Sequence, residues 1–181
     1  KPVFSINMLA TIILLIVFRG FLYRNSVFYS KVNSRSNIEL TNYSLIQEIQ
    51  KKIGNRKINI EEIIEISNEL TCEKLSFTFK KTSNNPNENL KSNKANGIGY
   101  SSLFNSIGNY ILSQQNMTNK YKFKHLVGKT EVFGFDLHSL LASPFFKDHD
   151  FNEIYNIETK EKIFIDPSLD DYFKINRVNS K

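Results

Sequence analysis

The chain has 181 residues, enough for one domain with a hydrophobic core and short for two. Its 24 Lys and Arg against 18 Asp and Glu give a net charge of +6, but the basic residues are scattered. No zinc-finger spacing, aromatic RNA-binding motif or dense basic run accompanies them, so we expect no nucleic-acid partner. The single cysteine, Cys72, excludes an intrachain disulfide and is interpreted as a small buried apolar residue, not a nucleophile.

The N-terminal segment is apolar over residues 3–23 and is long enough to cross the roughly 30 Å of a hydrocarbon core, with Arg19 near an interface. Its centre, "IILLIVF", is apolar on every face, which favours a membrane anchor over a helix buried on one side. An uncleaved signal sequence is the alternative. We therefore expect a single-pass membrane protein, and the basic residues after the span favour a cytoplasmic domain. The expected division is an anchor over 1–24, a connector over 25–41 and a domain over 42–181.

Two amphipathic helices are predicted next. "NYSLIQEIQKKIG" at 42–54 carries Leu and Ile at helical spacing and ends in Gly54. "INIEEIIEISNEL" at 58–70 follows, with Asn59 as its N-cap. "LSFTF" at 75–79 alternates as a strand does, and residues 81–97, rich in Asn, Ser and Lys, are expected to be a mobile loop.

The remaining elements complete the expected fold class. "NGIGYSSLFNSIGNYILSQ" at 96–114 repeats apolar residues at three and four, which predicts a buried helix starting near Gly97. "YKFKHLVGKTEVFGF" at 121–135 reads as strand with a turn at Gly128-Lys129, and 136–146 as a short helix or turn stopped by Pro144. Two strands near 151–157 and 163–165 form a closing hairpin. Helices followed by antiparallel strands indicate an α+β fold.

The closing hairpin carries two residues of chemical interest. His149 leads its first strand and Asp166 ends its second, 17 residues later. Because antiparallel strands run in opposite directions, these two positions share one edge of the sheet, and we expect a hydrogen bond between the two side chains. An acid that orients a histidine in this way is one part of a catalytic triad.

Three blocks resemble the transglutaminase-like superfamily, papain-type domains with catalytic residues in the order Cys, His, Asp. "NGIGYSSLF" at 96–104 is similar to the nucleophile helix, "HDFNEI" at 149–154 to the histidine motif, and "IFIDPS" at 163–168 to the aspartate motif. The resemblance covers roughly residues 60 to 170. It implies a core helix packed on an antiparallel sheet, with His149 as base, Asp166 as its orienting acid and no cofactor.

One departure decides what the resemblance implies about activity. Gly97 stands where the family carries its nucleophilic cysteine, so covalent acyl transfer has no attacking atom. Ser101 or Ser102 would be a substitute only from about 6 to 7 Å further along the helix. The resemblance therefore implies an inactive domain that binds a peptide or protein segment in the cleft.

Several alternatives stay open. In one alternative, the natural form carries a cysteine at position 97 and is a cysteine protease or amide acyltransferase. In another, the chain is a structural membrane-tethered domain. A metal site at Asp148, His149 and Asp150 is weaker, because His-Asp metal sites use a helical array with further ligands. His125 and His138 are interpreted as packed or surface residues.

Overall fold

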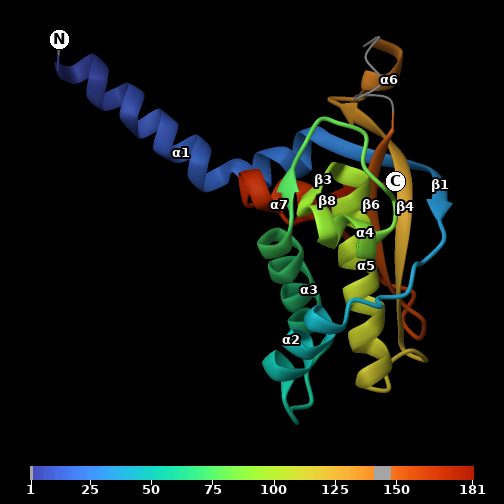
Figure 1. Ribbon diagram of the computed structural model, residues 1–181. Coiled ribbons are helices and arrows are strands. Elements are labelled where there is room, and N and C mark those ends of the chain that lie inside the picture. The colour runs from blue at the N-terminus through green and yellow to red at the C-terminus, as the bar shows by residue number, and fades with distance from the viewer. Residues whose placement is uncertain (1, 141–147) are drawn as a thin grey trace.

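The computed structural model describes residues 2–140 and 148–181 and shows an α+β fold preceded by an apolar helix (Figure 1). The elements in chain order are α1 (Pro2–Ser26), β1 (Val27–Arg35), α2 (Tyr43–Ile53), α3 (Ile60–Lys74), β2 (Ser76–Phe77), α4 (Pro86–Ser92), β3 (Lys94–Ala95), α5 (Gly97–Gln114), β4 (Tyr121–Val132), β5 (Phe135–Asp136), α6 (Leu137–Leu140), β6 (His149–Asn156), β7 (Lys162–Ile165), α7 (Pro167–Phe173) and β8 (Arg177–Ser180). The predicted α+β class is confirmed.

The main sheet closes into a barrel, which differs from the open antiparallel sheet expected. Its strands follow the order β1-β8-β7-β6-β4, and β1 also pairs with β4, so the sheet returns on itself. The sheet is mixed, because β1 and β8 are parallel while the other pairs are antiparallel. Residues 27–35, expected to belong to a connector, thus form the strand that closes the barrel by pairing with β4 on one side and β8 on the other.

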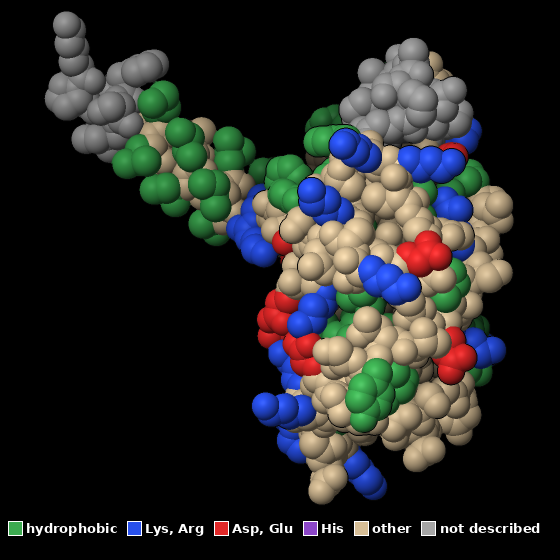
Figure 2. Space-filling view, viewed as in Figure 1, with side chains coloured by type: hydrophobic (Ala, Val, Ile, Leu, Met, Phe, Trp, Pro, Cys, Tyr) green, Lys and Arg blue, Asp and Glu red, His purple; other side chains and the backbone are tan. Residues whose placement is uncertain are grey.

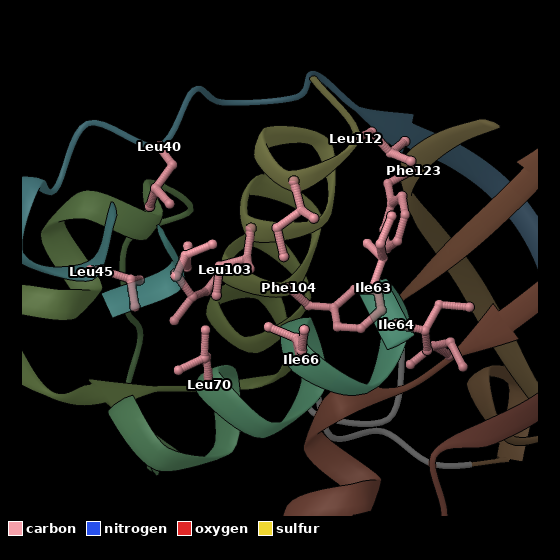
Figure 3. Packing of buried hydrophobic residues seen from close by; sticks show 14 of the residues in the cluster. Leu40, Leu45, Ile63, Ile64, Ile66, Leu70, Leu103, Phe104, Leu112 and Phe123 are labelled. Atoms are coloured by element: carbon pink, nitrogen blue, oxygen red, sulfur yellow. The ribbon is translucent and has the colours of Figure 1, made fainter. Parts of the chain in front are cut away.

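Apolar side chains form two separate cores. The larger lies between the barrel and the helices, where Leu103 and Phe104 of α5 meet apolar residues of α3 and Phe123 of β4 (Figure 3). The smaller fills the barrel around Tyr29, Leu126 and Phe151. This arrangement explains why residues 150–154 of β6 are all buried: one face of the strand packs on the helices and the other faces the barrel interior.

Helices α2, α3 and α5 begin and end close to their predicted positions. Asn59 caps α3 in a full capping box with Glu62, and Asn96 caps α5 through the amides of Ile98 and Gly99. Gly54 ends α2 with φ +60, a conformation that favours glycine. Local sequence signals were sufficient at these helix ends.

Two local predictions were wrong. The segment 81–97 is not a loop throughout, since it contains α4 and the short strand β3, which pairs in parallel with the two-residue β2. Strand β4 continues through Gly128, where an added Cβ would lie 2.8 Å from the ring of Phe151, so this glycine serves close packing. The turn lies instead at Phe133-Gly134, both with positive φ. Pro144 lies outside the described residues.

Helix α1 extends away from the domain, and hydrophobic side chains cover its described length (Figures 1 and 2). The apolar window Met8–Ser26 has none of its residues buried, which rules out the alternative of a helix packed inside the domain. Its C-terminal turns touch the domain, where Tyr23 packs on the barrel core. A helix of this length and composition serves as a membrane anchor or as a signal sequence.

Candidate active site

The structure brings His149 and Asp166 together at one end of the barrel. Strands β6 and β7 pair with Asn152 opposite Ile165, so the start of β6 and the residue after β7 lie at the same edge. His149 Nε2 lies 2.5 Å from Asp166 Oδ2, and the predicted hydrogen bond is therefore confirmed. The imidazole is 29% exposed at its side chain while the carboxylate is fully buried, so the ring edge reaches solvent and its partner does not.

Asp166 is held by donors on every side. Its Oδ1 accepts from the hydroxyl and amide of Ser168 and from the amide of Leu169, because Asp166 is also the N-cap of α7. Its Oδ2 accepts from the hydroxyl of Tyr29 at 2.9 Å in addition to His149. These bonds replace the water lost on burial and fix the carboxylate in one orientation.

Sequence reasoning missed Tyr29, the residue of β1 that reaches the site. Its ring lies 4.9 Å from that of His149, and its hydroxyl proton is committed to Asp166. The neighbouring hydroxyl of Tyr23, 2.7 Å away, must then donate to Tyr29. Burial first, and the charge of Asp166 second, raise the pKa of Tyr29 well above its ordinary value, so it remains a donor. The only local signal for this strand was the run of β-branched and aromatic residues at 27–29.

The pair forms an ion pair. Burial alone raises the pKa of a carboxyl, but His149 and the hydrogen bonds from Ser168 and Tyr29 outweigh it and hold the pKa of Asp166 below its usual value. Burial acts to lower the pKa of His149, yet the charge and hydrogen bond of Asp166, with a smaller effect from Asp150, raise it above its usual value. The charged forms therefore stabilise each other.

His149 is expected to titrate above the ordinary value of about 6.5, as followed by the Cε1 proton resonance of the full chain in detergent micelles. The Asp166→Asn variant should bring that pKa below about 6.5, because burial is then opposed only by the more distant Asp150. His149→Gln assigns the resonance.

The raised pKa of His149 also makes stability depend on pH. The stability that His149 contributes is complete below about pH 6.5 and is lost as pH rises through the pKa of the folded state. A value below about 6.5 in the unmodified chain would contradict the ion pair.

Gly97 faces this pair from the first turn of α5. A Cβ built on Gly97 would lie 4.0 Å from His149 Cε1 and 3.9 Å from Ser168 Oγ, which is ordinary van der Waals contact. The φ of Gly97 is not positive, so the backbone does not require glycine there. The three predicted site residues thus lie together, although only two of them carry functional groups.

The candidate serines do not reach the site. Ser101 is buried and donates to the backbone oxygen of Asp150, and Ser102 is buried and donates to that of Asn84. Each hydroxyl therefore connects α5 to a neighbouring segment. The structure gives no support to either serine as a nucleophile.

Asp150 belongs to a second buried cluster beside the site. It accepts from Arg35 at 2.5 Å and contacts His125 Nε2 at 2.8 Å, so His125 is a packed residue as expected. Among the described residues no group of three His, Cys, Asp or Glu is placed to hold a metal ion. The side chain of His138 lies outside the described part of the chain.

Cys72 of α3 is only partly buried, not buried as expected, and its thiol contacts the carbonyl oxygen of Pro167. Burial, its largest influence, and the nearby Asp171 raise the pKa of its thiol to about 12. Such a thiol is almost wholly protonated near neutral pH, which suits an unreactive residue. A surface hollow of about 490 Å³ beside Cys72 and another of about 510 Å³ beside Gly54 do not include His149.

Comparison with family models, with curated proteins and with solved structures found no match for this chain. The arrangement of Gly97, His149 and Asp166 therefore carries the functional inference.

Proposed function

We propose that this chain is a membrane-anchored domain of the transglutaminase-like superfamily, inactive because Gly97 occupies the nucleophile position. The observation that carries the proposal is the contact between the start of α5 and the histidine: a side chain at position 97 would meet His149 Cε1 at 4.0 Å. The helix start, the histidine and the acid also occur in the order that the papain-type mechanism uses. Two of its three functional groups are in place.

The geometry explains what the pair would do for a nucleophile. Asp166 holds Nε2 of His149, which leaves Nδ1 as the nitrogen that a thiol at position 97 would meet. The N-terminus of α5 carries partial positive charge, and the imidazolium adds a full one, so both would stabilise a thiolate. With glycine at this position no atom attacks an acyl carbon, and the pair has no thiol to deprotonate.

Binding of a peptide or protein segment is the function left to such a site. Gly97 is half-exposed beside His149 and Ser168, and the exposed edge of His149 offers a polar contact to a segment that binds at this surface. We therefore propose that this surface retains a peptide-binding role without the bond-breaking step.

An active cysteine protease or amide acyltransferase is the second candidate. It is favoured by the ion pair of His149 and Asp166, because such an enzyme would need both this base and its orienting acid. In that case the natural form has cysteine where this chain has Gly97, His149 is the base and Asp166 orients it. Sequencing the source gene separates the two candidates. The third candidate, a purely structural membrane-tethered domain, does not require Gly97, His149 and Asp166 to lie together.

Alkylation of the Gly97→Cys variant tests the proposal. The introduced thiol should be activated by His149 and by the start of α5, whereas a thiol at an ordinary surface position is not. Reactivity no greater than that of Cys72, in a variant that folds, removes the basis for the family assignment.

The full chain is expected to stay with membranes when washed with high salt or alkaline carbonate and to need detergent for release. The reason is the uniformly apolar, unburied window of α1. The double variant Leu14→Asp, Ile16→Asp should be released, because each acid at a span centre costs about 2.5–3.5 kcal/mol. Release of the unmodified chain by salt would contradict the membrane anchor. A mature protein that lacks the N-terminal helix would identify this helix as a cleaved signal sequence instead.

A further inference from the structure

Exposed aromatic side chains gather where α1 meets the domain. Phe133 and Phe135 flank the turn between β4 and β5 and are 75% and 66% exposed. Tyr172 and Phe173 end α7 and are 56% and 59% exposed. We call these four residues the aromatic collar. Large apolar side chains that are exposed together mark an interaction surface.

One hydrogen bond connects each half of the collar to α1. The amide of Phe133 donates to the carbonyl of Ser26, the last residue of α1, at 2.8 Å. Arg19 Nε donates to the carbonyl of Phe173 at 2.6 Å, nearly two turns earlier in α1. Figure 1 shows α7 beside this end of the helix. Phe21 and Leu22, which lie between Arg19 and Ser26 in α1, are also exposed.

The charges beside the collar are mainly uncompensated cations. Among the described residues, no carboxylate forms an ion pair with Arg19, Arg24 or Lys174. Of the nearby acids, Glu131 pairs with Lys181, and Asp136 with Lys129. Asp170 and Asp171 of α7 accept hydrogen bonds from Asn68 of α3 and Tyr100 of α5, so their carboxylates are directed toward the domain. Figure 2 shows Lys and Arg side chains at the base of the helix.

Arg19 sets the depth of this surface in the membrane. An arginine near the end of a membrane span places its guanidinium at the level of the lipid headgroups. Because that guanidinium bonds the carbonyl of Phe173, the end of α7 lies at the same level. Aromatic residues are enriched at this level of membrane proteins, where their rings contact both acyl chains and headgroups.

We propose that the aromatic collar lies in the headgroup region of a bilayer that contains anionic lipid, so that the domain rests on the membrane surface. The inference rests on the membrane anchor proposed above. Lipid is favoured over a second copy of this chain because a copy would bring like charges together at Arg24 and Lys174, whereas anionic headgroups would neutralise them. The contacts from Tyr23 through Tyr29 to Asp166 then place the candidate site at the membrane-facing end of the domain.

Depth-dependent quenching tests this proposal on the full chain in nanodiscs of phosphatidylcholine and phosphatidylglycerol. In a Cys72→Ser background, Phe133→Cys and Phe173→Cys are each labelled with a fluorophore, and lipids with a spin label near the headgroup serve as quencher. Tyr43→Cys is the matched control, because it is 71% exposed and begins α2, at the far end of the domain from α1. We expect quenching about threefold stronger at positions 133 and 173 than at 43, and weaker when phosphatidylcholine replaces phosphatidylglycerol.

The outcomes separate the collar from the anchor. Equal quenching at the three positions in an inserted chain overturns the collar and leaves the anchor standing. A chain that does not insert overturns both. A disulfide formed between two Phe173→Cys chains, together with absent quenching, shows that a second copy covers this surface and also overturns the proposal.

Discussion

At about pH 6, the thiol introduced by Gly97→Cys is expected to react with iodoacetamide about 100-fold faster than Cys72, or more. The pKa of Cys72 is raised to about 12, so only about one such thiol in a million is ionised at that pH. A thiol beside His149 and the start of α5 is expected to have a pKa of about 7, so about one-tenth of it is ionised at the same pH. The ionised fractions therefore differ by roughly 10⁵. Because a more acidic thiolate is a weaker nucleophile, the expected ratio of the two alkylation rates is about 10²–10³.

Two further variants make the alkylation result specific. His149→Ala added to Gly97→Cys should slow the reaction about fivefold, because the pKa of the thiol returns toward about 8.5 while its nucleophilicity rises. Ser101→Cys is the matched control one turn along α5, where the side chain is fully buried against β6, and it should stay unreactive. Mass spectrometry of the labelled peptides over time gives the three rates. Equal rates at positions 97 and 101 in folded variants would mean that the helix start has no special environment.

Asp166→Ala is expected to lower the melting temperature of the full chain in detergent by about 5–15 °C. The carboxylate is fully buried, and its removal leaves the hydroxyl of Tyr29 and the imidazolium of His149 without their acceptor. It also removes the N-cap of α7. Together these losses amount to about 2–4 kcal/mol of the free energy of unfolding.

A surface acid provides the comparison for Asp166. Glu158→Ala in the exposed turn after β6 should leave the melting temperature nearly unchanged, since substitutions of exposed residues away from such contacts stay within about 0.5 kcal/mol. Near-UV circular dichroism of both variants reports whether the barrel keeps its packing. A loss for Asp166→Ala no larger than that for Glu158→Ala would show that the bonds to this carboxylate add nothing to stability.

The sequence by itself determined the elements whose signals are local. Helix α3 follows from an apolar repeat and from the pair Asn59 and Glu62, which satisfy each other's backbone amides within one turn. The meeting of His149 with Asp166 was predictable for the same reason, because a hairpin brings together residues only 17 positions apart. Short-range pairing depends on few choices of register, so pattern alone was sufficient.

Tertiary structure alone decided the parts that depend on distant partners. Residues 27–35 show no alternation of apolar and polar side chains, and they form a strand because β4 and β8, about a hundred residues or more away, supply their hydrogen bonds. The contact of Tyr29 with Asp166 exists only because that strand closes the barrel. Gly128 resembles a turn residue in sequence, yet the ring of Phe151 occupies the space where its side chain would be. Backbone propensity is a property of neighbours in the chain, whereas barrel closure and close packing are properties of neighbours in space.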